Sequence, residues 1–154
     1  MQKGTSRMKK VLAELNIATA KESLDSPLLK EFVDNLDKVN AIAEHHHGFI
    51  WRLKDDSGNA TNIQAFDNLN TIVNLSVWAD VASLKDFMFK TDHVTFFKKK
   101  AQWFEKPKQA TYVLWWVNEN ERPTVEQGIE RLNTLRELGD TPNAFSFKQP
   151  FKAQ

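Results

Sequence analysis

The sequence of 154 residues contains no cysteine, only one tyrosine and no long apolar run. Without cysteine the chain forms no disulfide, thiolate metal site or cysteine nucleophile, so thiol redox chemistry is excluded. This suits a reducing compartment, and we expect a cytoplasmic protein. No run approaches the roughly 20 apolar residues that span a bilayer. The formal net charge of +1 gives no field that would attract a nucleic acid. We therefore expect neither a membrane nor a nucleic-acid partner.

Several sequence motifs of common enzymes are also missing. The chain has no phosphate-binding glycine loop, no nucleophile elbow and no chelating cluster. The basic start of the chain is followed by a glutamate and an asparagine within 11–16, which interrupt any signal-peptide core. We expect a disordered extension over residues 1–8, a single domain over 9–148 and a tail over 149–154.

Hydrophobic periodicity divides the chain into strands and helices. Alternation predicts a strand over 10–18, and Ser26 followed by Pro27 predicts the start of a long amphipathic helix. We expect further strands over 49–53, 60–66, 71–78, 110–118 and Phe145–Phe147. We expect further helices from Asp80, from Thr91 or Asp92 through Phe104, and from Thr124 to Gly139. The strand at 110–118 is so continuously apolar that we place it in the middle of the sheet.

This order predicts an α+β fold. Its first part has the split pattern of a ferredoxin-like antiparallel sheet, with helices on one face and a C-terminal helix and short strand added. Tryptophan (5) and phenylalanine (11) are plentiful. An open sheet face rich in aromatic residues usually binds a second subunit. We therefore expect a homodimer.

Three of the four histidines are adjacent, at His45, His46 and His47. Neighbouring residues on a helix point about 100° apart, so these side chains cannot converge on one metal ion. Their place before Gly48 favours the last turn of a helix, where imidazoles face the negative end of the dipole and glycine takes a left-handed cap. We expect no metal site here, and His47, nearest to the strand, is the candidate if one of them has a function.

The fourth histidine, His93, shares a predicted helix face with Phe97, Lys100 and Phe104, and Trp103 flanks it. A histidine in such company is commonly a hydrogen-bonded residue of the core or its rim. It is also a candidate general base, because imidazole titrates near neutrality.

Polar residues interrupt the apolar strands at Asn16, Arg52 and Asn74. A buried polar group without a partner costs on the order of 1 to 3 kcal/mol, so each must pair with protein, water or a ligand. Glu14 is the obvious partner of Arg52. The pattern predicts either a buried salt bridge with interface hydrogen bonds or a ligand pocket. The residues that would wall a pocket, unless they belong to the core, are Trp51, Trp78, Trp103, Trp115 and Trp116.

Five segments carry a family resemblance: LAELNIA (12–18), GFIWRLKDDSGNAT (48–61), NLSVWAD (74–80), DHVTFFKKKAQWFEK (92–106) and LWWV (114–117). Together, over residues 10–148, they resemble an uncharacterised bacterial family of unknown function. That family is grouped with the antibiotic-biosynthesis-monooxygenase-like dimeric α/β barrels. The resemblance implies a ferredoxin-like subunit, a homodimer joined through its sheets, and a cavity between sheet and helices.

Some members of that superfamily are cofactor-free monooxygenases, and others bind haem through a helix histidine. For the first activity, the resemblance implies a small aromatic or quinol-type substrate and no cofactor. His93 would take the phenolic proton and Arg52 would hold the anion. The substrate-binding residues would be Asn16, Trp51, Asn74, Trp78, Phe97 and Trp103. The alternatives are a haem protein with His93 as axial ligand, and a non-catalytic dimeric binding or accessory protein.

Overall fold

The structure is a computed structural model, and it describes residues 9–54, 70–90 and 98–153. The predicted strand near residue 60, the helix start at Thr91 or Asp92 and the predicted extension over residues 1–8 lie largely or wholly outside these ranges. Within them, no helix combines the length and apolar character that crossing a bilayer requires.

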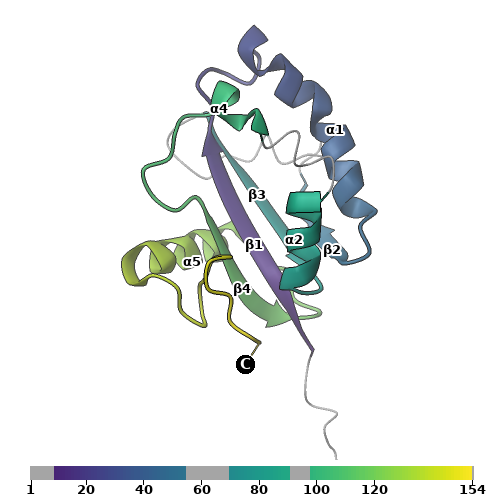
Figure 1. The fold of residues 1–154 in the computed structure, drawn as a ribbon, viewed down its shortest axis with the longest axis vertical. Coiled ribbons are helices and arrows are strands. Elements are labelled where there is room, and N and C mark those ends of the chain that lie inside the picture. The colour runs from purple at the N-terminus through teal and green to yellow at the C-terminus, as the bar shows by residue number, and fades with distance from the viewer. Residues whose placement is uncertain (1–8, 55–69, 91–97, 154) are drawn as a thin grey trace, which may run out of the picture.

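Four strands form one antiparallel sheet (Figure 1). They are β1 (Lys10–Thr19), β2 (Phe49–Arg52), β3 (Thr71–Trp78) and β4 (Tyr112–Asn118). Their order is β2-β3-β1-β4, so β1 is central and β4 lies at an edge. The prediction of a central β4 was therefore wrong. Its residues are apolar because structure packs on both of its faces, not because it has a strand on either side.

The helices are α1 (Lys30–Glu44), preceded by the 3₁₀ turn η2 (Pro27–Leu29), α2 (Val81–Lys90), α4 (Lys100–Trp103) and α5 (Val125–Leu138). Local sequence signals mark the start of α2 and both ends of α5, whereas the predicted first helix begins as a 3₁₀ turn and becomes α-helical at Lys30. The Asp80 carboxylate accepts a 2.8 Å hydrogen bond from the backbone N–H of Ser83 and so caps α2. Thr124 and Gln127 form the predicted capping box of α5, and Gly139 ends that helix with a φ of 76°.

Helices cover both faces of the sheet. On one face, Leu12, Trp78 and Leu114 pack with residues of α1 and α2. On the other, Ala13, Leu15 and Trp115 pack with Leu132 and Leu135 of α5. Figure 1 shows α5 lying apart from α1 and α2, alongside β4. The α+β class and the antiparallel sheet are confirmed. The structure differs from the predicted arrangement in the position of α5.

The position of α5 corrects the expectation that helices cover one face and leave the other to a second subunit. The backbone of α5 approaches β1 closely, because a Cβ at Gly128 would lie 2.3 Å from Cδ1 of Leu15. The central residues of that face, including Leu15 and Val77, are already buried within one chain. The homodimer stays a prediction, without support from an open sheet face.

The segment after α5 returns to the edge of β4. Leu114 and Phe145 exchange two backbone hydrogen bonds, of 2.8 and 2.9 Å. Instead of the short strand predicted over 145–147, this is a single β-bridge. The ladder does not continue to the next hydrogen-bonded pair, because the backbone N–H of Phe147 donates to the side-chain hydroxyl of Tyr112 at 3.0 Å and not to its carbonyl. Further on, Phe151 packs against Phe145 within the predicted tail.

The histidine triplet directly follows α1, with His45 as the C-cap, and so lies just beyond the last helical turn in which it was predicted. Gly48 also has a different role. Among the described residues, Gly139 is the one with a positive φ. Gly48 is needed for space, since a Cβ there would lie 2.2 Å from Cβ of Ser83 on α2. His46, rather than His47, makes the buried contacts: its Nε2 lies 2.8 Å from Asp86 Oδ2, and Nδ1 accepts from Gly48 N–H. No metal-binding group of three His, Cys, Asp or Glu residues occurs among the described residues.

Candidate functional site

A cavity of about 450 Å³ lies between the sheet and helices α1, α2 and α4. Its size is that of a typical small-molecule site. Much of its wall is aromatic, formed by Phe32, Phe89, Trp103, Phe104, Tyr112 and Phe147. Seven polar residues also line it: Glu14, Asn16, Asn40, Arg52, Asn74, Lys100 and Thr111. The cavity can therefore hold a molecule that is largely apolar and carries a few polar groups.

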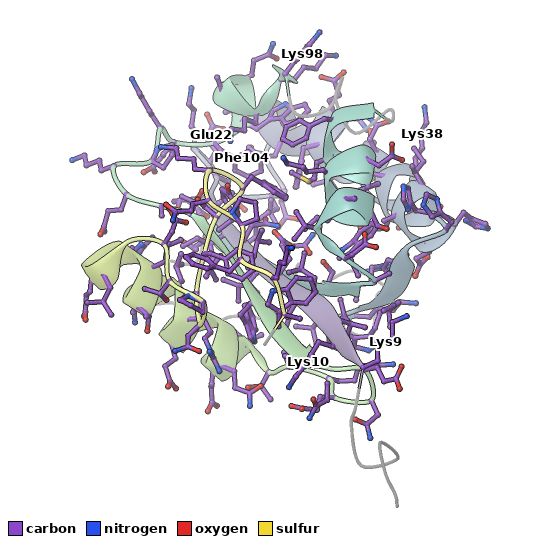
Figure 2. All side chains as sticks on the ribbon, turned by 60° about the horizontal axis from the view of Figure 1, so that its bottom comes forward. Lys9, Lys10, Glu22, Lys38, Lys98 and Phe104 are labelled. Atoms are coloured by element: carbon purple, nitrogen blue, oxygen red, sulfur yellow. The ribbon has the colours of Figure 1, made fainter. Side chains whose placement is uncertain are left out.

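The aromatic wall is held by contacts between α1, α4 and β1. The ring of Phe32 lies 5.6 Å from that of Trp103 and 5.0 Å, edge to face, from that of Phe104. A β-bridge between Ala20 and Phe104 joins the end of α4 to the end of β1. Figure 2 shows Lys38 and Lys98 pointing outward at the periphery, with Phe104 further inside. Phe32, Trp103 and Phe104 thus belong to a packed core, which gives this part of the wall a fixed shape.

The polar residues on the strands share one face of the sheet because of its register. Glu14 on β1 and Arg52 on β2 both pair with Ser76 on β3, and Asn16 pairs with Asn74. Paired residues in antiparallel strands point to the same side. The alternation along each strand therefore brings these five polar side chains together on the cavity side of the sheet.

Glu14 is the most unusual of them. Glu14 is a buried residue, only 5% exposed. The amide of Asn16 donates a 2.6 Å hydrogen bond to Oε2, and the hydroxyl of Ser76 donates a 3.2 Å hydrogen bond to Oε1. Burial raises the pKa of Glu14 to about 7, and these two hydrogen bonds hold it from rising further. At neutral pH the carboxyl can therefore accept or release a proton.

Arg52 pairs with Glu44 and not, as predicted, with Glu14. Its Nε lies 3.2 Å from Oε2 of Glu44, and Nζ of Lys54 lies 2.9 Å from the same oxygen. The pKa of Glu44 is lowered, chiefly by the hydrogen bond from Lys54. The expected pair is not formed because β3 separates β1 from β2, so that Ser76 lies between the two side chains. Arg52 nevertheless lines the cavity, with an 11% exposed side chain.

The structure brings together four of the eight predicted site residues. Arg52, Asn16, Asn74 and Trp103 all line the cavity. Trp78 lies on the same face of the sheet as the polar residues but is 2% exposed, buried with residues of α1 and α2 and outside the cavity lining. Trp51 packs against the core on the α5 side of the sheet. His93 and Phe97 fall outside the described residues, so their roles as base, haem ligand or substrate contact stay predictions.

Sequence reasoning missed Glu14 as the titrating residue of the site. It assigned the carboxylate to a salt bridge, because a charged residue between apolar neighbours usually has a charged partner. The available signal was the motif Glu14-Leu15-Asn16, which places a carboxyl and an amide on the same side of a strand. Whether that side carries a countercharge depends on a strand distant in sequence.

Residues 11–154 match a family described as a domain of unknown function, DUF3291. No curated protein sequence matches the chain. Among solved structures, it is similar to SnoaB, a cofactor-independent oxygenase from Streptomyces nogalater, at 15% identity and a TM-score of 0.48, over 75% of this chain and 97% of that one. It is also similar to a protein of unknown function from Nitrosomonas europaea, at 14% identity and a TM-score of 0.47, over 77% and 97% of the two chains. A protein from Shewanella oneidensis is similar at 10% identity and a TM-score of 0.48, over 72% and 91%. The match over nearly its whole length shows that the chain belongs to the DUF3291 family.

Proposed function

We propose that the protein is an enzyme that binds a small aromatic molecule in the cavity and removes a proton from it with Glu14. The supporting observation is the buried carboxyl of Glu14, whose pKa is raised to about 7 beside an aromatic wall. A general base is most effective when its pKa lies near the working pH. Carboxyls perturbed in this way are common at functional sites.

The neighbours of Glu14 suit the anion that such a step produces. When a phenol or quinol hydroxyl gives its proton to Glu14, negative charge develops on the substrate oxygen. Arg52 supplies a positive charge on the same side of the sheet, and Asn74 supplies an amide donor. Donors that are already in place stabilise a developing oxyanion well in a site that excludes water. The rings of Phe32, Trp103 and Phe104 can pack on the aromatic part of the substrate.

The finer proposal is a monooxygenase-like reaction with molecular oxygen and no cofactor. The quinol anion passes its electrons to oxygen, one oxygen atom bonds to a ring carbon, and the other leaves as water. The hydroquinone becomes a hydroxyquinone, so the substrate supplies all the electrons. In this scheme Glu14 takes the first proton, in place of the role predicted for His93.

An oxygen electrode tests this proposal with the purified protein and a panel of hydroquinones and polyphenols. We expect oxygen uptake with at least one compound, and at least a 100-fold loss of that uptake in Glu14→Gln, about the contribution of a general base. Glu119→Gln is the matched control, because Glu119 is an exposed carboxylate outside the cavity. Quenching of tryptophan fluorescence should show that Glu14→Gln still binds the compound, since Trp103 lines the cavity.

Two other results would redirect the proposal. Full activity of Glu14→Gln would exclude Glu14 as the base, and tight binding without oxygen uptake by any compound would favour a non-catalytic binding protein. The haem alternative is tested by adding hemin and recording the visible spectrum. A Soret shift that is lost in His93→Ala would support it over the cofactor-free reaction.

A further inference from the structure

A short series of hydrogen bonds leads from Glu14 to a tryptophan on the same face of the sheet. Nε1 of Trp78 donates a 2.9 Å hydrogen bond to Oγ of Ser76, and the same hydroxyl donates to Oε1 of Glu14 at 3.2 Å. Ser76 and Trp78 lie two residues apart on β3 and so point to the same side. Both are buried. This series of hydrogen bonds thus links the carboxyl to the interior of the protein.

The chemistry of these groups fixes the direction of each hydrogen bond. An indole N–H can only donate, whereas a serine hydroxyl has one proton and can rotate to place it. With Trp78 donating to its oxygen, the proton of Ser76 points to Glu14. The amide of Asn16 donates to the other carboxylate oxygen. Each oxygen of Glu14 therefore accepts one hydrogen bond from the protein, which sets the rotation of the carboxyl.

We propose that Trp78 is a positioning residue: its indole N–H orients the Ser76 hydroxyl, which in turn holds Glu14 as the proton acceptor of the cavity. This inference rests on the proposed function, because it assigns the carboxyl a role in proton transfer. Trp78 does not touch the substrate in this scheme. It was predicted as a substrate contact, but it is 2% exposed and does not line the cavity.

The indole is itself held firmly by its neighbours. Its ring stacks on Phe87 of α2 at 5.1 Å and meets Phe49 edge to face at 5.4 Å. The ring of His46, at the end of α1, lies 5.6 Å away. Two helices and a strand therefore fix the direction of the N–H. A donor fixed in this way supports the hydroxyl better than mobile water would.

Other charged and titratable groups near these hydrogen bonds must be kept constant in any test. Arg52 from β2, Lys100 from α4 and Tyr112 from β4 line the same cavity as Glu14. On the far side of Trp78, His46 is bound to Asp86. The substitution Trp78→Phe changes none of these groups and keeps an aromatic ring between Phe87 and Phe49.

Carboxyl ¹³C NMR of protein labelled at glutamate measures the pKa of Glu14 directly. In Trp78→Phe we expect that pKa to rise, because the Ser76 hydroxyl is no longer directed at the carboxylate and stabilises it less. Ser76→Ala should raise it by at least as much, and the double variant should not exceed Ser76→Ala. The matched control is Trp116→Phe, which also removes an indole hydrogen bond, the 2.8 Å one to Phe151 O. It should leave the pKa of Glu14 unchanged.

A second measurement does not require a stable Trp78 variant. In the wild-type protein, the ¹H–¹⁵N signal of the Trp78 indole should shift with pH at the same midpoint as Glu14, and this shift should disappear in Ser76→Ala. An unchanged Glu14 pKa in Trp78→Phe, an equal rise in Trp116→Phe, or an indole signal that ignores the Glu14 titration would each overturn the inference. Both measurements are made without substrate, so they can fail while oxygen uptake succeeds, and the reverse.

Discussion

Replacing Glu14 by glutamine should make the protein more stable above neutral pH while removing its proposed activity. The folded protein raises the pKa of this carboxyl from 4.5 to about 7, so folded chains hold the proton more tightly than unfolded chains. Stability therefore has its full value below about pH 4.5, falls as the pH rises to about 7, and is level above. The difference in pKa corresponds to about 3 kcal/mol. Glutamine has nearly the same shape and no charge, so it escapes this loss, but its NH₂ group replaces one of the two oxygens that accept hydrogen bonds from Asn16 and Ser76.

Urea denaturation between about pH 4 and about pH 8 measures this effect as the difference between wild type and variant. We expect the difference in stability between Glu14→Gln and wild type to move in favour of the variant by up to about 3 kcal/mol from the acid end to the basic end. The hydrogen-bond acceptor that glutamine lacks lowers the stability of the variant by the same amount at every pH. Glu119→Gln, at an exposed site, should show no such trend. A difference between wild type and Glu14→Gln that is the same at every pH would refute the reasoning, because it would mean that Glu14 titrates alike in folded and unfolded chains.

Three further substitutions test the packing described above. Gly128→Ala should lower stability by about 1 to 3 kcal/mol, because the new methyl group would overlap the side chain of Leu15, and an unchanged melting temperature would contradict the close approach of α5. Gly48→Ala should be destabilising in thermal melts through its clash with Ser83, and Ser83→Gly should rescue it in part; no rescue would point to a backbone cause instead. Thr124→Ala should lower the free energy of unfolding, measured by urea denaturation, by about 1 kcal/mol because it removes the capping box. A decrease smaller than a few tenths of a kcal/mol would show that α5 is held by packing alone.

Features set by neighbouring residues could be predicted from the sequence, and features set by distant ones could not. The strands β1 and β3, the proline at the start of η2 and the capping box at Thr124 were predicted from local signals, and the structure contains each of them. The edge position of β4 depends on pairing with β1, far away in the chain. A continuous apolar run shows that both faces of a strand are covered, but not what covers them.

In the candidate site, too, features set by neighbouring residues could be predicted and features set by distant residues could not. Asn16, Arg52 and Asn74 stood out because polar groups are costly within apolar strands, and they do line one cavity. The partner of Arg52 came instead from the end of α1, where helix and strand geometry combine to place Glu44. The raised pKa of Glu14 likewise comes from burial, and that buried environment exists only once three strands have been aligned.

The position of α5 has a consequence for any partner that approaches this side of the sheet. The helix covers, with residues of the same chain, the sheet face on which a second copy would otherwise pack. A partner that approaches the sheet from this side would therefore meet the outer surface of α5 and not the strands themselves.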